Sequence, residues 1–152
     1  MMHENEPLSD QVFHQFLALM RTNRQYSRQM IDERGIKPRD MAVLHFLSEK
    51  DFVTVSQVQR YIHHSASTTS TQIAKLEEAG FVTRTRTQTD NRVVLVALTQ
   101  KGHDLVEKTP LGGLPLLRQE LEGLSPERLK VMSGVFTEIQ ALMQWEDAEW
   151  AL

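Results

Sequence analysis

Three arginines in a predicted β-hairpin, residues 81–99, have the chemistry to contact nucleic acid. Arg84 and Arg86 alternate along the first strand and therefore share one face, where they suit phosphate contact or internal pairing with an acid. Arg92 lies in the polar tip, where Asp90 can fold back onto the guanidinium and hold it ready for a narrow minor groove. One exposed arginine usually has no function, but three in a single hairpin favour DNA binding.

A predicted helix just before the hairpin, residues 66–79, carries short hydroxyl and amide side chains. Successive helical residues rotate by about 100°, so the helix divides into two faces. The inward face is predicted to comprise Ala66, Thr69, Ile73 and Leu76. The opposite face comprises Ser67, Thr68, Thr71 and Lys75, with Gln72 at its flank. These polar side chains can reach base edges and phosphates in a major groove, although a plain solvent-facing surface has the same composition.

Capping signals predict another short helix just before this one in the sequence. Thr54 followed by Gln57 is a capping-box pattern that begins a short helix. Ser65 is predicted to cap the helix that Gly80 ends. A helix, a turn, a second helix and a basic hairpin, in this order, predict a winged helix-turn-helix. Thr54 and Ser65, at the two helix starts, and Asn91, at the hairpin tip, complete the predicted DNA-binding residues.

Further helices are predicted on both sides of this unit. Ser9 is expected to cap the first of them, Gly35 to end it, and Pro38 to lie in the first turn of the next. After a helix that Thr99 caps, the prolines and glycines of residues 109–115 interrupt the helical pattern. This interruption is either a hinge or a tolerated kink, and we favour the kink.

The two ends of the chain are more apolar than one small DNA-binding lobe needs. The apolar faces of these terminal helices have little of their own chain to pack against, so we expect them to be buried between two chains. Such faces are, however, more often buried within a single chain. We therefore predict one chain, residues 1–152, that is mainly α with a small β-hairpin wing. The winged helix-turn-helix lobe is expected over residues 36–103, and a helical dimerisation region over residues 9–35 and 116–150.

Charge is distributed unevenly along the chain, whose formal net charge is −3. Residues 54–103 hold six basic side chains against three acidic ones, whereas residues 104–152 hold four against nine. The positive excess therefore lies in the segment predicted to contact DNA. The absence of cysteine excludes disulfides, thiolate metal sites and thiol-based oxidant sensing. The chain has neither an apolar run of about 18 residues nor a signal-peptide pattern, so we expect a cytoplasmic protein with no membrane partner.

Several runs of the chain together resemble one known family. The wing signature of MarR-family transcriptional regulators resembles Gly80-Phe81-Val82-Thr83-Arg84, Asp90-Asn91-Arg92 and Leu98-Thr99-Gln100-Lys101-Gly102. Upstream, residues 38–47 are similar to the second helix of that family, and residues 75–80 to the end of its recognition helix. The resemblance covers residues 9–108 by pattern, and the C-terminal helix in position and character.

The resemblance implies an obligate homodimer on double-stranded DNA, built from the N- and C-terminal helices, with two lobes on a near-palindromic operator. It places Arg92 in the minor groove with Asp90 orienting it. It also implies regulation by a small effector, often a phenolic or other aromatic acid, that binds between the dimer layer and the lobe. We expect a repressor that needs no cofactor. Five side chains of the first two helices, all histidine, aromatic or methionine, are the candidate effector residues: His14, Phe16, Met20, Tyr26 and His45.

The sequence leaves two alternative functions open and argues against a third. The pairs His45–Glu49 and His103–Glu107 have the four-residue spacing of shared metal ligands, so a zinc-responsive regulator of the same fold is an alternative. The recognition helix contains no arginine, which would also suit a winged-helix module that binds another protein instead of DNA. An enzyme is not expected, because the chain has no phosphate-binding glycine loop, nucleophile elbow or zinc-protease pattern.

Overall fold

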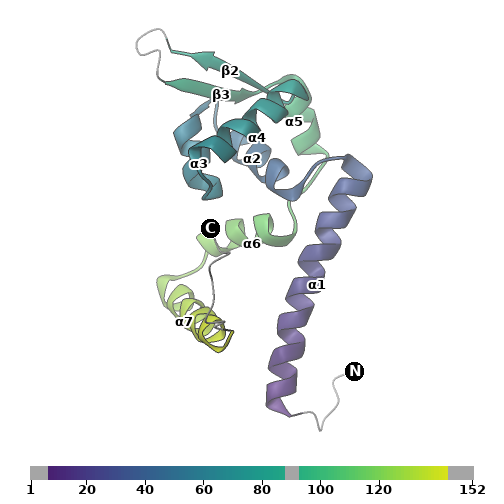
Figure 1. The fold of residues 1–152 in the computed structure, drawn as a ribbon, viewed down its shortest axis with the longest axis vertical. Helices are drawn as coiled ribbons and strands as arrows, with labels where there is room; N and C mark the ends of the chain where they lie inside the picture. The colour runs from purple at the N-terminus through teal and green to yellow at the C-terminus, as the bar shows by residue number, and fades with distance from the viewer. Residues whose placement is uncertain (1–6, 88–92, 144–152) are drawn as a thin grey trace. The chain divides into compact units, whose positions relative to one another are not determined.

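The computed structural model describes residues 7–87 and 93–143. In chain order its elements are α1 (Leu8–Arg34), α2 (Pro38–Ser48), β1 (Val53–Thr54), α3 (Val55–Ile62), α4 (Ala66–Glu78), β2 (Val82–Arg86), β3 (Val94–Leu98), α5 (Gln100–Glu107), α6 (Gly113–Glu122) and α7 (Pro126–Leu142) (Figure 1). The predicted class, mainly helical with a small β wing, is confirmed. Among the described helices, none combines the length and the apolar character needed to cross a membrane.

The predicted helix caps are present at the helices of the lobe. Thr54 Oγ1 accepts from Gln57 N–H at 3.2 Å, and Gln57 Oε1 accepts from Thr54 N–H at 2.7 Å, which completes the capping box. Gly35 ends α1 with a left-handed φ of 65°. The prediction for Ser9 is wrong, because α1 already begins at Leu8 after Pro7, and no described side chain caps its first turn.

The sheet is antiparallel, with strand order β1-β3-β2. Val82 pairs with Leu98 at one end of the β2–β3 hairpin, and Arg86 pairs with Val94 at the other. The short strand β1 pairs Val53 with Val96. The hairpin therefore projects from a sheet that is anchored at its base by buried valines.

The chain divides into two compact units at residue 116. The core of the first unit lies where α2, α3 and α4 meet the sheet, and α2 contributes more of its buried residues than any other element. The fully buried side chains there include Met41, Val43, Leu44, Leu47, Val53, Val58, Ile73, Val82 and Val96. In the second unit, α7 has no buried residue among those that the structure describes.

A short connector, residues 108–112, separates α5 from α6. The interruption predicted over 109–115 is real but shorter, because α6 begins at Gly113 and a proline is tolerated in the first turn of a helix. The connector is fixed to the rest of its unit, since His45 Nε2 donates to Thr109 O at 2.8 Å. Tyr26 packs so closely on Gly112 that a Cβ there would lie 2.5 Å from its ring.

Candidate nucleic-acid interface

The helix α4 begins at the turn that follows α3. His63 ends α3 with a left-handed φ of 52°, and Ser65 is the N-cap of α4. Ser65 Oγ accepts from Thr68 N–H at 3.2 Å and lies 3.1 Å from Ser67 Oγ. The first turn of α4 is therefore ordered by hydroxyl groups, and its unpaired N–H groups give this end a positive potential that suits phosphate.

The two faces of α4 agree with the predicted pattern at most positions. Thr69 and Ile73 are fully buried and Leu76 is 4% exposed, so the inward face is confirmed there. The prediction is wrong for Ala66, which is exposed. Exposed side chains line the opposite face, namely Ser67, Thr68, Thr71 and Lys75.

Gln72 does not lie on the exposed face, contrary to our prediction. Its side chain is 4% exposed, and Nε2 donates to Asp40 Oδ1 at 2.7 Å and to Arg39 O at 3.3 Å. Burial raises the pKa of the Asp40 carboxyl, and the hydrogen bond from Gln72 opposes this shift. Gln72 therefore fixes α4 against α2, and a DNA contact by its amide is excluded while it remains there.

The hydroxyls on the exposed face are partly committed to the helix itself. Thr71 Oγ1 donates to Ser67 O at 3.0 Å, and Ser65 Oγ donates to Thr68 Oγ1 at 2.9 Å. A hydroxyl that donates in this way keeps its acceptor lone pairs. In this conformation Thr71 is suited to accept from exocyclic amino groups of adenine or cytosine in a major groove.

Arg84 of β2 is paired internally with Glu77 of α4. Its Nε donates to Glu77 Oε2 at 2.7 Å, its Nη2 lies 2.6 Å from the same oxygen, and its backbone N–H donates to Oε1 at 3.2 Å. These hydrogen bonds and the positive charge hold the pKa of Glu77 below its ordinary range. Arg84 therefore has the internal pairing, which is one of the two roles predicted for it. Arg86 is exposed.

We expect Glu77→Gln to loosen the first strand of the wing, because the backbone N–H of Arg84 loses a charged acceptor. Amide exchange at Arg84 should become faster than in the parent and in the matched variant Glu78→Gln, whose exposed carboxylate lies next in sequence. Since the folded-state pKa of Glu77 is lowered, the pair stabilises the wing fully above the ordinary glutamate pKa of about 4.3, and this effect is lost as the pH falls from there through the lowered pKa. Equal exchange in both variants at neutral pH would contradict this role.

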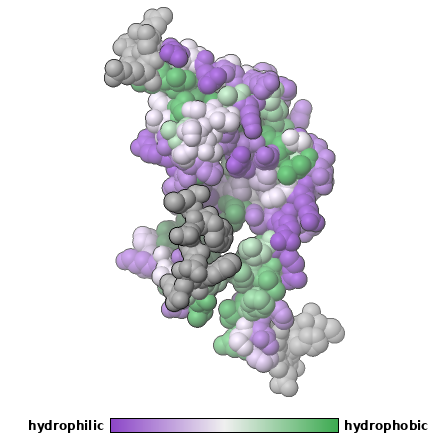
Figure 2. All heavy atoms as spheres, in the orientation of Figure 1, coloured by the Kyte–Doolittle hydropathy of each residue, from purple (hydrophilic) through white to green (hydrophobic). Residues whose placement is uncertain are grey.

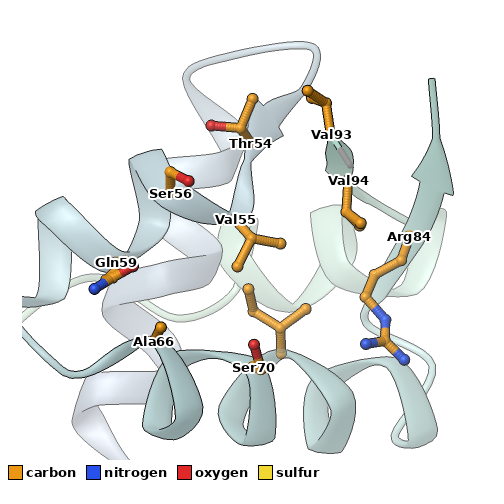
Figure 3. Close-up of a pocket in the computed structure, with 10 residues that line it drawn as sticks. Thr54, Val55, Ser56, Gln59, Ala66, Ser70, Arg84, Val93 and Val94 are labelled. Atoms are coloured by element: carbon orange, nitrogen blue, oxygen red, sulfur yellow. The ribbon is translucent and has the colours of Figure 1, made fainter. Parts of the chain in front are cut away.

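A pocket of about 380 Å³ lies between α3, α4 and the sheet. Its polar lining comes from Thr54, Ser56, Gln59, Ser70 and Arg84, and its apolar lining from Val55, Ala66, Ile73, Val93 and Val94. Figure 3 shows the Arg84 side chain extending from β2 toward α4, while Ser70 rises from α4 itself. Sequence reasoning missed Ser56, Gln59 and Ser70, which become neighbours of Arg84 only when the hairpin folds over α3 and α4.

The remaining predicted site residues belong to the hairpin tip and to α1 and α2. Asp90, Asn91 and Arg92 lie outside the described residues. Among the proposed effector residues, Tyr26 and His45 both contact the connector. His14 and Met20 are exposed and Phe16 is half-buried on α1.

The histidine–glutamate pairs do not come together as a larger metal site. Within residues 7–87 and 93–143, no three His, Cys, Asp or Glu side chains lie close enough to hold a metal ion. His45 Nε2 faces the Thr109 carbonyl instead.

The lobe and its wing match known proteins of one kind. Residues 25–109 match the family model described as transcriptional regulator SarA/Rot. YdgJ, an HTH-type transcriptional regulator of Bacillus subtilis strain 168, is 24% identical over 106 residues, which are 70% of this chain and 65% of that protein. The organic hydroperoxide resistance transcriptional regulator of the same strain is 28% identical over 116 residues, or 76% of this chain and 78% of that protein.

Solved structures show the same fold. Sco3205, a MarR family transcriptional regulator from Streptomyces coelicolor crystallised in complex with DNA, aligns with a TM-score of 0.63 at 20% identity, over 96% of this chain and 95% of that chain. The matched family model covers more than half of the present sequence, including both helices of the helix-turn-helix and both strands of the wing. This chain therefore belongs to the SarA/Rot family of DNA-binding transcriptional regulators, which are not enzymes, and it has the winged helix-turn-helix fold seen in MarR family regulators.

Proposed function

We propose that this protein is a cytoplasmic, ligand-responsive repressor that binds a near-palindromic operator as a homodimer. The observation that carries the proposal is the exposed polar face of α4, which ends in Lys75 and lies beside a wing that bears Arg86. Hydroxyls suit base edges and phosphates, and the two basic side chains suit phosphates.

Each part of the lobe has its own role in this proposal. Ser67, Thr68 and Thr71 enter the major groove, while Thr54 and Ser65 bring the starts of α3 and α4 to the backbone. Arg92 enters the minor groove, with Asp90 and Asn91 beside it in the tip. Arg84 acts indirectly, since its pair with Glu77 fixes the wing on α4.

Exposed apolar side chains on α1 and on α7 support the homodimer. On α1, Leu8, Val12, Phe13, Leu19 and Met20 are 52–74% exposed. Figure 2 shows apolar side chains on the visible side of the N-terminal half of α1. On α7, Val131, Val135, Phe136 and Leu142 are 46–88% exposed. Apolar surfaces of this extent are rarely left open to water, and a second copy related by a twofold axis would cover both.

Unsatisfied polar groups near the connector support an effector site there. Tyr26 Oη and Thr109 Oγ1 are buried, and neither has a hydrogen-bond partner among the described residues. Burial raises the pKa of Tyr26 above its ordinary value, so the phenol stays protonated and can donate at neutral pH. A small aromatic acid could accept from both groups. Thiol oxidation is excluded as the signal, because the sequence contains no cysteine.

Lys75→Ala tests the DNA-binding face directly. If Lys75 neutralises one phosphate, the variant should lower the salt slope of operator binding by about one unit for each chain bound, hence by about two for a dimer. The measurement is fluorescence anisotropy of a labelled operator at several salt concentrations, with the stoichiometry determined at high DNA concentration. An unchanged slope would remove Lys75 from the interface, and a stoichiometry of one chain per operator would contradict the homodimer.

A further inference from the structure

Three consecutive backbone carbonyls follow α4, and the start of α5 donates a hydrogen bond to each of them. Lys101 Nζ donates to Ala79 O at 2.7 Å. Thr99 Oγ1 donates to Gly80 O at 2.6 Å, and Thr99 N–H donates to Phe81 O at 3.0 Å. These carbonyls belong to the whole link between the recognition helix and the wing, because α4 ends at residue 78 and β2 begins at residue 82.

The backbone N–H groups of the same link are bound on the other side, to α4 itself. Gly80 N–H donates to Glu77 O and Phe81 N–H to Leu76 O, both at 2.9 Å, which is the Schellman pattern of helix ends. Gly80 has a φ of 79°, which glycine adopts without steric cost. The link is therefore held from two directions, by α4 through its N–H groups and by α5 through its carbonyls.

Thr99 joins the two helices through a single hydroxyl. Its Oγ1 donates to Gly80 O and accepts from Gly102 N–H at 3.1 Å, so it caps α5 while it holds the exit of α4. A hydroxyl has one proton to donate and lone pairs to accept with, and both capacities are used here.

Lys101 and Gly102 complete the contact. The Lys101 ammonium lies at the C-terminal end of α4, where the helix dipole favours a cation, and 4.8 Å from the centre of the Phe81 ring. Gly102 is buried, and a Cβ there would overlap the Phe81 carbonyl oxygen. The close approach of α5 to the link thus requires glycine at this position.

We propose that Thr99, Lys101 and Gly102, which we call the latch, set the angle between the recognition helix and the wing. Thr99 and Lys101 are then positioning residues for DNA binding, which they support without contacting bases. A three-residue link with free carbonyls would let the wing swing relative to α4, so that the two could not reach adjacent grooves together. This proposal rests on the proposed function, in which α4 and the wing bind DNA at the same time.

Thr99→Val tests the latch without changing charge, because valine keeps the branched shape and removes the hydroxyl. Losing this partly buried hydrogen bond is expected to lower operator affinity by about tenfold. The salt slope should also decrease, since fewer phosphates are engaged together. Thr99→Ser keeps the hydroxyl and should bind like the parent. Ser48→Ala is the control for lost stability, because it removes a hydroxyl-to-carbonyl bond of 2.7 Å, to His45 O, elsewhere in the lobe.

Binding is compared at a temperature where circular dichroism shows every variant folded. A folded Thr99→Val protein with the affinity and salt slope of the parent would overturn the latch. Amide exchange of Gly80 and Phe81 in the DNA-free protein gives an independent test. Exchange should be faster in Thr99→Val than in Ser48→Ala, and equal rates would also overturn the latch. A parent protein that binds no DNA would instead overturn the proposed function, and the exchange rates would still decide whether Thr99 holds the link.

Discussion

Arg92→Ala is expected to weaken operator binding by far more than the loss of one surface charge would. A charge-assisted hydrogen bond contributes about 1.5–3 kcal/mol, which is about tenfold or more in affinity, and a homodimer would lose one such contact in each wing. The expected loss is therefore about 100-fold. Sedimentation should show the same oligomeric state as the parent, because the proposed dimer surfaces lie on α1 and α7. The measurement is anisotropy of a labelled operator at fixed salt.

Lys130→Ala is the matched control for this variant. Lys130 is exposed on α7, outside the lobe and off the helix face that carries Val131 and Val135, so its loss removes one positive charge without altering the proposed DNA interface. We expect it to change operator affinity by no more than a few fold, through long-range electrostatics alone. If Arg92→Ala and Lys130→Ala bind the operator equally well, the minor-groove role of Arg92 is wrong.

Gly102→Ala is expected to destabilise the lobe, although alanine normally stabilises a helix by about 1 kcal/mol relative to glycine. The added Cβ would overlap the Phe81 carbonyl oxygen and lie 3.0 Å from Leu98 Cδ2, so the start of α5 must move away from the link. Forced overpacking of this kind costs about 1–3 kcal/mol. The melting temperature should fall by about 2–4 °C for each kcal/mol lost.

Gly134→Ala is the opposite case and serves as the control. Gly134 lies within α7, and nothing lies within 4 Å of a Cβ added there. This substitution should raise the free energy of unfolding by up to about 1 kcal/mol. A Gly102→Ala protein that is also stabilised would show that α5 does not pack on the link as closely as described.

Local signals in the sequence were sufficient to predict the elements of the lobe. Caps at Thr54, Ser65 and Thr99 are short-range hydrogen bonds within one turn, so their residue types and spacing determine them. The ends of α1 and α4 are marked by Gly35 and Gly80, because each of these glycines adopts a left-handed backbone conformation. Where a contact is local, the pattern predicts it.

Contacts between elements were not predictable in the same way. Gln72 falls at the edge of the exposed face by helical angle alone, and only the position of α2, with Asp40, buries it. The Glu77–Arg84 pair depends on how the hairpin folds back over α4. The residues of the latch belong to the family signature that the sequence contains. Only the tertiary structure shows that they bind the three carbonyls of residues 79–81.

Binding to the DNA that flanks its own gene, compared with unrelated DNA over a range of salt concentrations, tests the central claim most directly. A sequence-specific regulator should prefer its operator by about 10³-fold or more at physiological salt. Its affinity should fall steeply as salt increases, because the lobe binds through phosphate contacts. Equal, weak binding to both DNAs, or no binding at low salt, would contradict the account.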